Sequence, residues 1–388
     1  MDRPTGKCQL NDWHDRSSKA AERCALTQGT QRVLTPRGSQ IPSHTDASAA
    51  RPADDSSLSG SPSTPLVSVG LFVYNGEPYL EEALNSILNQ TFTDFELIIS
   101  DNASTDRTGE IAHAYAGQDD RIRYYRSEKN MGAGWNIRRV YELATGKYYK
   151  QAAADDILEP DFLWRCVEVL ESEPDCVVAY SSTKEIDANG TFIKNYVTPV
   201  SADSNDPVAR FRGMLLNSGM CYQIFGVMRM SALRQLPPQG SYVNADGMLL
   251  ARMSLLGRLY EIPEYLFISR RHSGQSGQTL PVRVKQPRRF RLTSRHSGLP
   301  SIEWWDPEKT RALTLPQFRM LLEYFLTIYR APLSAGQKLR CYSMLLVWIK
   351  TRRKRLWKDL IIAADQLLYN VQSSKTGTPR FPSGGEAL

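Results

Sequence analysis

The chain lacks the two glycine-rich signatures by which nucleotide-binding proteins are most readily recognised. No Gly-x-Gly-x-x-Gly follows the first apolar segment, and no Gly-x-x-x-x-Gly-Lys-Ser/Thr occurs in the 388 residues. In proteins that carry them, these loops hold the phosphates of a dinucleotide or a nucleoside triphosphate. The sequence therefore contains no phosphate-binding loop of the dinucleotide-binding type or of the P-loop type.

Cysteine is scarce, and long apolar runs are missing. The cysteines lie far apart and show no paired spacing typical of metal ligands: Cys8, Cys24, Cys166, Cys176, Cys221 and Cys341. Buried free thiols in a reducing compartment explain them most simply. The start of the chain has no apolar core of a secretory signal, and Met344–Ile349 is far too short to span a bilayer. We expect a cytoplasmic protein.

The overall composition is that of a soluble globular protein with a basic balance. Hydrophobic residues make up 41% and charged residues 23%, and the formal net charge is +7. A positive chain favours anionic partners. Charge alone leaves nucleotide phosphates, anionic lipid and nucleic acid open.

Apolar segments and helical patterns alternate between residues 66 and 181. Strands are predicted at 66–74, 95–100 and 122–126, and each is followed by a helix with one apolar face. Such alternation with short connections is typical of a doubly wound α/β fold with right-handed crossovers. Ligands of these folds bind at the carboxyl ends of the strands.

The segment from Gly146 to Phe162 carries two adjacent carboxylates. A strand pattern precedes Asp155 and Asp156, and Pro160 suits the first position of a following helix. Neighbouring carboxylates repel one another, so a site that keeps both ionised usually supplies a cation. Mg²⁺ or Mn²⁺ shared with substrate phosphates fits best. The alternative is an Asp-rich turn that caps the next helix.

Four motifs, in order, carry a family resemblance. They are Pro65–Asn75, Asn89–Asp106, Asn130–Gly132, and Ala144–Tyr148 leading to Asp155 and Asp156. This ordered set resembles the family 2 glycosyltransferases over residues 65 to about 275. The resemblance implies the GT-A fold and an inverting enzyme that uses a nucleotide sugar.

The resemblance also implies roles for residues at the strand ends. Asp101 falls where the family binds the base, Asp155 where it binds ribose, and Asp156 where it holds a metal on the diphosphate. Tyr74 and Glu77 line the base pocket by their position. The implied cofactor is a divalent metal, Mn²⁺ or Mg²⁺.

Two motifs depart from the family pattern. Ala153 stands where many members have the first Asp of Asp-x-Asp-Asp, which bears on metal affinity. Asn102 and Ala103 stand at the second and third positions of the usual Asp-Asp-Gly-Ser. Asn102 keeps hydrogen-bonding capacity without the charge.

Further site residues are expected after Ser181, where the alternation weakens. Asp246 begins a helix predicted from Tyr242 to just before Gly257, at the place where the resemblance implies the catalytic base. A helix cap is the alternative for this residue. His272, beside Arg270 and Arg271, resembles an Arg-x-His-x-x-Ser segment of the family, and such groups suit a diphosphate.

The chain after residue 280 is basic and aromatic. Helices are predicted from Leu315 to Tyr329 and from Ala335 towards Leu368. The run Lys350–Lys358 follows an apolar stretch and suits an anionic lipid surface. A solvated helix face that closes the domain is an equally good interpretation.

These patterns predict an α/β protein with the GT-A fold: a Rossmann-like, doubly wound mixed sheet with an acceptor-binding half and C-terminal helices. Disordered tails are predicted at 1–64 and 373–388. Between them, the glycosyltransferase domain is predicted at 65–280, with a nucleotide-binding half at 65–181 and an acceptor half at 182–280. A basic helical region is predicted at 281–372.

The function predicted is transfer of a sugar from a nucleotide-diphosphate sugar to an acceptor hydroxyl, in bacterial surface polysaccharide or glycan assembly. The acceptor is expected to be a glycan or a lipid-linked molecule, with peripheral contact to an anionic membrane and no nucleic acid partner. Two alternatives remain open. A non-catalytic sugar- or lipid-binding relative would explain Ala153, and a nucleotidyltransferase would share the α/β half.

Overall fold

The computed structural model describes residues 64–376 apart from 200–201, 217–218, 241, 243 and 276–314. Most of the tail predicted at 1–64 lies outside these residues, as do Cys8, Cys24, the start of the basic region from 281, and the end of the tail predicted from 373. The domain boundaries predicted from sequence stay predictions.

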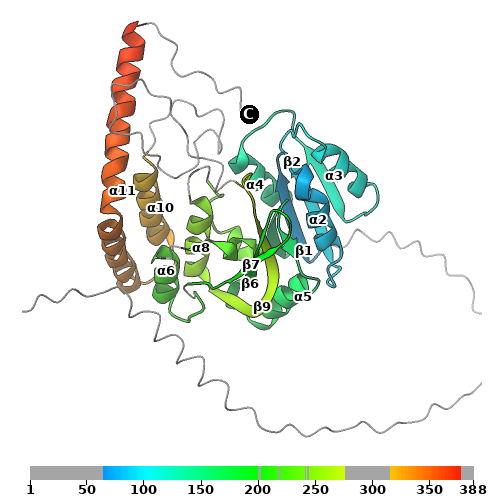
Figure 1. The fold of residues 1–388 in the computed structure, drawn as a ribbon. Helices are drawn as coiled ribbons and strands as arrows, with labels where there is room; N and C mark the ends of the chain where they lie inside the picture. The colour runs from blue at the N-terminus through cyan, green and yellow to red at the C-terminus, as the bar shows by residue number, and fades with distance from the viewer. Residues whose placement is uncertain are drawn as a thin grey trace, which may run out of the picture. The chain divides into compact units, whose positions relative to one another are not determined.

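The first half of the fold is a parallel sheet with helices on both faces (Figure 1). Its elements are β1 (Val67–Val73), α2 (Glu77–Leu88), β2 (Phe95–Asp101), α3 (Thr108–Ala116), β3 (Ile122–Arg126), α4 (Ala133–Leu143) and β4 (Tyr148–Ala153). The strands lie in the order β3-β2-β1-β4, and all neighbours are parallel. Strands covered on both faces must be apolar along their whole length, which explains the continuous runs in β1 and β2.

Two hydrophobic clusters fill the space on the two faces of this sheet. Leu97 and Ile99 belong to the cluster with α2, α3 and α5, whereas Ile98 belongs to the cluster with α4, α6 and α8. Alternate residues of a strand point to opposite faces, so β2 contributes to both clusters. The sheet is thus a central layer that fixes where its strand ends lie.

The second half extends the same sheet with mixed pairing. Its elements are β5 (Ile157–Leu158), α5 (Phe162–Ser172), β6 (Cys176–Asp187), β7 (Phe192–Tyr196), α6 (Pro207–Leu216), η1 (Tyr222–Phe225), β8 (Val227–Arg229), α7 (Met230–Leu233), α8 (Ala245–Leu256) and β9 (Arg258–Arg271). The order continues β4-β8-β6-β9-β5, with β7 also on β6. β8 is antiparallel to β4 and β6, and β6 and β9 are parallel. The predicted doubly wound mixed sheet is confirmed.

Two C-terminal helices, α10 (Pro316–Arg330) and α11 (Ala335–Thr376), pack beside α6 and α8. Met320 of α10 and Trp348 of α11 are buried in the same cluster as Met248 of α8. A buried ion pair joins α8 to α10, with Arg252 Nη2 2.7 Å from a carboxylate oxygen of Glu323. Within the described residues, no helix has both the length and the apolar character that crossing a bilayer requires.

Several element boundaries differ from the sequence prediction. Pro160 is not the first helical residue, because β5 pairs with β9 first and α5 begins only at Phe162. Asn244 has a left-handed backbone (φ 63°), so α8 begins at Ala245 rather than at Tyr242.

Other details at the element ends were not expected. Phe225 belongs to η1, and β8 begins at Val227. Gly257 follows α8 as predicted but is extended rather than left-handed; a Cβ there would lie 2.5 Å from the Asp175 carbonyl oxygen. α11 continues to Thr376, past the predicted start of the tail at 373.

The cysteines of the described residues are free, as predicted. Cys166, Cys176 and Cys341 are buried, and Cys221 is half-buried. Burial raises the pKa of the Cys166 thiol to about 12 and that of Cys176 to about 11. These thiols are therefore packing groups rather than nucleophiles.

Candidate active site

The strand order reverses direction at β1, and the candidate site lies at that point. β1 pairs with β2 on one side and β4 on the other, so that Val73 lies opposite Asp101 and Phe72 lies opposite Ala153. β2 and β3 lie on one side of β1, and the chain then crosses over β1 to place β4 on its other side. The carboxyl ends of β1, β2 and β4 therefore surround the switch point, where open α/β sheets bind ligands.

The loop after β1 is fixed to the loop after β2. Asn75 has a left-handed backbone (φ 52°); its N–H donates to Ser104 Oγ at 2.9 Å, and its Oδ1 accepts from Thr105 N–H at 2.8 Å. Glu77 accepts from Arg107 N–H at 3.1 Å, next to the start of α3. Tyr74 is 48% exposed. Of the two residues predicted at the base pocket, Tyr74 thus reaches solvent, whereas Glu77 contacts the region before α3.

Asp101 ends β2 and is completely buried. Its Oδ1 accepts from Ser104 N–H at 2.8 Å, and its Oδ2 accepts from Tyr124 Oη at 3.0 Å and from Arg126. Burial and the Asp101 charge raise the pKa of Tyr124. Arg126, 46% exposed, is the partner that reaches solvent, and sequence reasoning missed it. The direct contact of Asp101 with a base stays a prediction.

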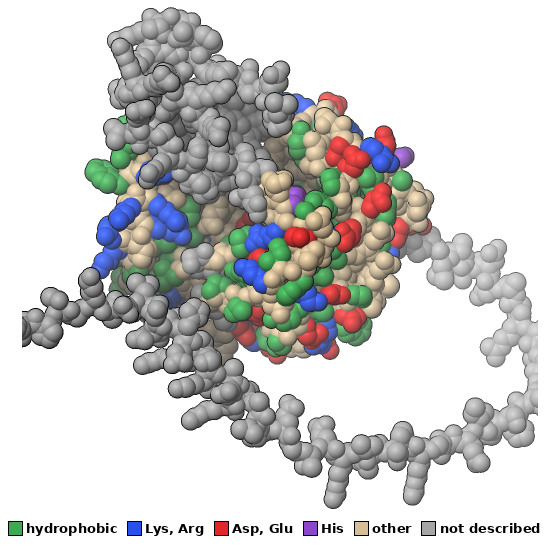
Figure 2. Space-filling model, in the orientation of Figure 1, with side chains coloured by type: hydrophobic (Ala, Val, Ile, Leu, Met, Phe, Trp, Pro, Cys, Tyr) green, Lys and Arg blue, Asp and Glu red, His purple; other side chains and the backbone are tan. Residues whose placement is uncertain are grey.

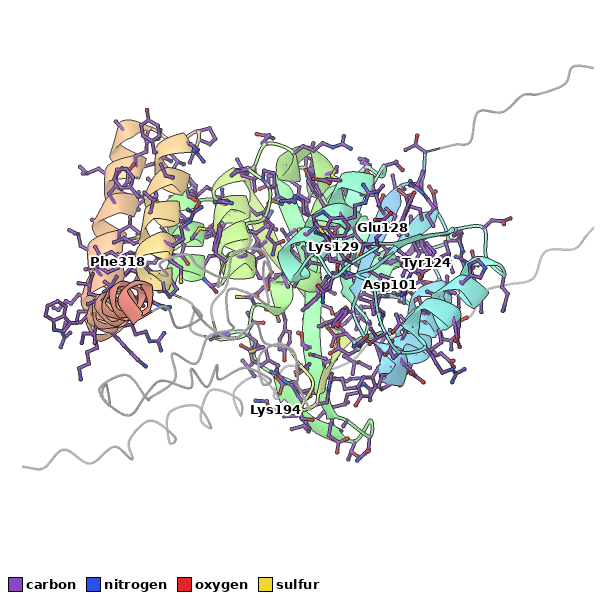
Figure 3. The ribbon with its side chains drawn as sticks, turned by 90° about the horizontal axis from the view of Figure 1, so that it is seen from above. Asp101, Tyr124, Glu128, Lys129, Lys194 and Phe318 are labelled. Atoms are coloured by element: carbon purple, nitrogen blue, oxygen red, sulfur yellow. The ribbon has the colours of Figure 1, made fainter. Side chains whose placement is uncertain are left out.

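A cavity of about 570 Å³ lies beside this strand end. Its lining includes Tyr125 and Arg126 of β3, Lys129 of the following loop, and Trp135 and Arg139 of α4. Figure 3 places Lys129 and Glu128 close to Asp101 and Tyr124. The lining holds three basic side chains, two aromatic rings and one carboxylate, Glu128, so that its charge balance is positive and suits a planar anionic ligand.

Asp155 and Asp156 lie on the turn after β4, and the end of β9 closes over them. Asp156 is buried, and its Oδ1 accepts from Arg270 N–H at 3.1 Å. Burial and the neighbouring Asp155 carboxylate raise the pKa of Asp156 to about 8. Asp155 Oδ2 lies 2.9 Å from His272 Nε2. The structure thus brings together three of the predicted site residues: Asp155, Asp156 and His272.

Arg270 holds this arrangement in place, whereas the sequence pattern grouped it with Arg271 and His272 as a contact of the diphosphate. It is 2% exposed, and its Nε donates to the Asp155 carbonyl oxygen at 3.2 Å. Its guanidinium also pairs with Glu82 and lies 4.7 Å from the ring centroid of Tyr79. The His272 ring lies 4.8 Å from the same Tyr79 ring. α2 therefore supplies a support for both Arg270 and His272.

Arg271 points elsewhere. Its guanidinium lies 2.8 Å from Glu185 Oε1 on β6 and 5.6 Å from the ring centroid of Tyr222. Alternate residues of β9 face opposite sides, so Arg270 and Arg271 separate. The predicted pair of Arg271 and His272 does not form one group in the structure.

A buried lysine lies behind the acidic turn. Lys150 is 1% exposed and donates to the Gln151 carbonyl oxygen at 3.1 Å. Burial lowers the pKa of Lys150 to about 8, and the Asp156 charge opposes that shift. In sequence, Lys150 looks like an ordinary polar position of a strand, so its burial was not predictable.

Asp246 lies in the first turn of α8, but it does not cap the helix. The N-cap position is Asn244, and no side-chain cap hydrogen bond forms. Asp246 Oδ1 accepts from Gln239 Nε2 at 2.5 Å, and burial raises the pKa of Asp246. The cap interpretation is therefore wrong. The preceding Ala245 packs with Phe72 of β1 and with α4, so α8 begins close to the switch point.

The carboxylates of the acidic turn are few for a metal site, but they suit a divalent cation that substrate phosphates share. Among the described residues, no group of three or more His, Cys, Asp or Glu side chains could hold a metal ion. Mg²⁺ and Mn²⁺ are commonly held by one or two carboxylates, with substrate phosphates and waters completing the shell. Asp155 and Asp156 match that requirement: burial and then the Asp155 charge raise the pKa of Asp156, and a bound cation would favour its ionised form.

The fold is α/β, and its first half is a doubly wound sheet of the type that binds nucleotides. Carboxylates lie at the switch point of this sheet. The family model described as "Glycosyl transferase family 2" matches residues 68–236. The match bears out the resemblance to this family that the sequence motifs predicted. The mixed sheet agrees with the GT-A fold that this resemblance implies.

Curated relatives match only part of their length. The chain is 35% identical over 131 residues to chondroitin synthase of Escherichia coli, which covers 34% of this chain and 19% of that protein. It is 37% identical over 134 residues to an uncharacterized glycosyltransferase of Methanocaldococcus jannaschii, covering 34% and 46%. It is 31% identical over 144 residues to hyaluronan synthase of Pasteurella multocida, which covers 37% of this chain and 14% of that protein. The chain therefore spans less than half of each of these relatives.

Solved structures show a more distant likeness. S. aureus TarS 1–349 in complex with UDP matches with a TM-score of 0.48 and 18% identity, over 70% of this chain and 68% of that chain. The mannosyltransferase PcManGT from Pyrobaculum calidifontis, solved with GDP-Man and Mn²⁺, matches with a TM-score of 0.42 and 15% identity, over 82% and 77%. The family assignment rests on the sequence match alone.

Proposed function

We propose that the protein is an inverting glycosyltransferase that moves a sugar from a nucleoside-diphosphate sugar to an acceptor hydroxyl. The observation that carries this proposal is the acidic turn at Asp155 and Asp156, next to the switch point, inside the segment that matches the family 2 model. Such a site meets the anionic part of a donor at the carboxyl ends of parallel strands.

The donor side is formed by the ends of β1, β2 and β4. We assign Tyr74 and Glu77 to the base side and Asp155 to the ribose. Asp101 is buried, so its first role is to hold Tyr124 and Arg126 at the base side. The basic and aromatic cavity next to it supports a planar, charged donor.

Asp156, with Asp155 beside it, would hold a divalent metal, Mn²⁺ or Mg²⁺. When bound, this ion neutralises the charge that grows on the diphosphate leaving group. His272 lies on Asp155 and is placed to meet the same group. Arg271 can contact the diphosphate only if its ion pair with Glu185 breaks. Ala153 removes a third carboxylate that many family members have, which lowers the expected metal affinity.

Asp246 is the proposed general base. Its carboxylate takes the proton from the acceptor hydroxyl as that oxygen attacks the anomeric carbon from the face opposite the leaving group. The carbon–oxygen bond to the acceptor forms while the bond to the diphosphate breaks, so the configuration inverts. The raised pKa of Asp246 makes the carboxylate a stronger base than an exposed Asp.

The proposed acceptor is a glycan or a lipid-linked molecule of bacterial surface polysaccharide assembly. The named curated relatives include synthases of chondroitin and hyaluronan, which are polysaccharides. We place the enzyme in the cytoplasm, where the free cysteines would stay reduced, at the inner face of the plasma membrane.

Nucleotide-sugar turnover with added Mn²⁺ tests the proposal. Incubation with a panel of UDP-, GDP- and dTDP-sugars should release nucleoside diphosphate, and NMR of the product should show the inverted anomer. Binding without turnover would favour the non-catalytic relative that Ala153 suggests. Release of pyrophosphate from a nucleoside triphosphate and a sugar phosphate would favour a nucleotidyltransferase.

A further inference from the structure

α10 and α11 expose apolar and basic side chains together on one face. On α11 this face is formed by Leu339, Leu346, Lys350, Arg353, Trp357 and Ile361, which we name the α11 outer face. Leu339 is 71% exposed, Leu346 68% and Trp357 67%. Side chains of this size rarely cluster in water unless the surface binds something.

The spacing of these residues shows that the outer face points away from the domain. Cys341, Leu345, Trp348 and Leu356 are buried against the core at intervals of three, four and eight residues. The outer-face residues follow the same helical period but lie on the opposite side of α11. The exposed residues therefore form a second stripe, in addition to the one that closes the domain.

α10 extends the apolar part of this surface. Its Leu322, Phe325 and Tyr329 are about half-exposed or more. The Phe325 ring centroid lies 5.0 Å from that of Tyr342 on α11, so the exposed sides of the two helices adjoin. Figure 1 shows the two helices side by side, and Figure 2 shows Lys and Arg side chains next to hydrophobic ones where α11 lies.

The charge on this surface has one sign. Residues 335–358 contain eight Lys and Arg residues and no Asp or Glu. Arg340 pairs with Asp206 of the domain, and Arg353 donates to the Lys350 carbonyl oxygen one turn earlier. An anionic partner is favoured by so many positive charges on one segment.

Only one class of partner suits both properties. A second copy of this chain would place Lys350, Arg353 and Lys354 against the same three cations of its partner, which repels. A soluble polyanion suits the charges but leaves Leu346, Trp357 and Ile361 without apolar contacts. An anionic bilayer takes up both kinds of side chain, because apolar groups enter the boundary of the acyl chains while Lys and Arg meet the lipid phosphates.

We propose that the α11 outer face, with the adjoining side of α10, binds an anionic bilayer surface. α11 lies along the membrane, Leu346 and Trp357 enter the headgroup boundary, and Lys350, Arg353 and Lys354 contact anionic headgroups. This deepens the membrane location proposed above, and it does not depend on which sugar is transferred.

Vesicle flotation of the full chain tests the proposal. The protein should float with vesicles that contain phosphatidylglycerol and stay behind with phosphatidylcholine alone, and added salt should weaken the binding. Changing Lys350, Arg353 and Lys354 to Gln should weaken it by roughly a hundredfold. Changing Leu346 and Trp357 to Gln should also weaken it strongly, because apolar area is lost.

A matched control uses Trp164 of α5, which is 54% exposed but lies on another helix. Trp164→Gln should bind vesicles as the unmodified protein does. Gln keeps good helix propensity, and circular dichroism verifies that every variant is folded. Turnover measured without vesicles should be unchanged in all variants, so failure of this inference differs from failure of the proposed reaction.

Three results would overturn the inference. The first is that the unmodified protein does not bind phosphatidylglycerol vesicles at low salt. The second is that the variant of Leu346 and Trp357 binds vesicles as well as the unmodified protein, which would indicate a polyanion site. The third is that light scattering shows a dimer that this variant abolishes, which would indicate a second copy on this face.

Discussion

The most informative perturbation is Asp246→Asn, because it separates basicity from structure. Asp246 Oδ1 accepts a hydrogen bond from Gln239 Nε2 at 2.5 Å, and burial raises its pKa. Asn keeps an oxygen in the same place for Gln239 and has nearly the same size. The substitution therefore removes the negative charge and little else.

Two effects on stability oppose one another in this variant. The raised pKa means that the folded state disfavours the ionised carboxylate, so removing the charge is favourable. The carboxylate also lies in the first turn of α8, where the helix dipole favours a negative charge by about 0.3–1 kcal/mol. We expect the free energy of unfolding to change by less than about 1 kcal/mol. Turnover should fall by roughly a hundredfold or more, the usual contribution of a general base.

The pH dependence follows from the same shift. A base must be ionised to act, so kcat/KM of the unmodified enzyme should fall as the pH drops through a pKa above the usual value of about 4 for Asp. Folded Asp246 keeps its proton to higher pH than unfolded Asp246. Its contribution to stability is therefore lost as the pH rises from about 4 through the raised pKa, and the Asn variant lacks this loss.

Gln239→Leu gives an independent test of the same group. It removes the hydrogen bond that favours the charged form, so the acidic limb of the rate profile should move to higher pH. The assays are kcat and KM against pH, donor affinity, and melting temperature for both variants. Unchanged turnover in Asp246→Asn would refute the assignment of the base. Asp203, Asp206 and Glu261 would be the next candidates, although each already accepts from other side chains or the backbone.

Three further predictions concern other parts of the chain. Asp156→Asn should abolish Mn²⁺-dependent protection by a nucleotide sugar in thermal unfolding while leaving the metal-free protein folded; retained protection would remove the metal assignment. Glu323→Leu should cost about 3–5 kcal/mol in denaturant unfolding, because it leaves Arg252 buried without its carboxylate, and Arg252→Met in the same chain should recover much of the loss. Deleting residues 1–62 should leave turnover and melting temperature nearly unchanged, since their composition cannot form a core; a large drop in melting temperature would contradict this.

The strand-end part of the site was predictable from sequence because each clue is local. Strands covered on both faces give continuous apolar runs, and the polar residue that ends such a run must lie at the sheet edge. Asp101 ends β2, and Asp155 follows β4 by two residues, as the pattern indicated. The order of the motifs then indicated a resemblance to the family, and the match over 68–236 confirms that resemblance.

The supports of the site were not predictable, because they depend on pairings between distant segments. Arg270 reaches Asp155 and Asp156 only because β5 pairs with β9, more than 100 residues away in the chain. Arg271 is turned to Glu185 by the alternation of β9, which the uninterrupted basic pair in the sequence does not reveal. Asp246 looked like a cap because the left-handed turn at Asn244 has no clear sequence signal.

The acidic turn at Asp155 and Asp156 and the proposed base Asp246 are held in place by different parts of the fold. Asp155 and Asp156 are held by the sheet, through Arg270 at the end of β9. Asp246 is held by α8, which Arg252 ties to α10 through a buried ion pair. α10 in turn packs on α11, so the proposed membrane face and the proposed base belong to one packed group of helices. A substitution that loosens α10 should therefore reduce turnover while leaving donor binding at the strand ends intact. A loss of donor affinity in Glu323→Leu equal to its loss of turnover would show instead that the two supports are not independent.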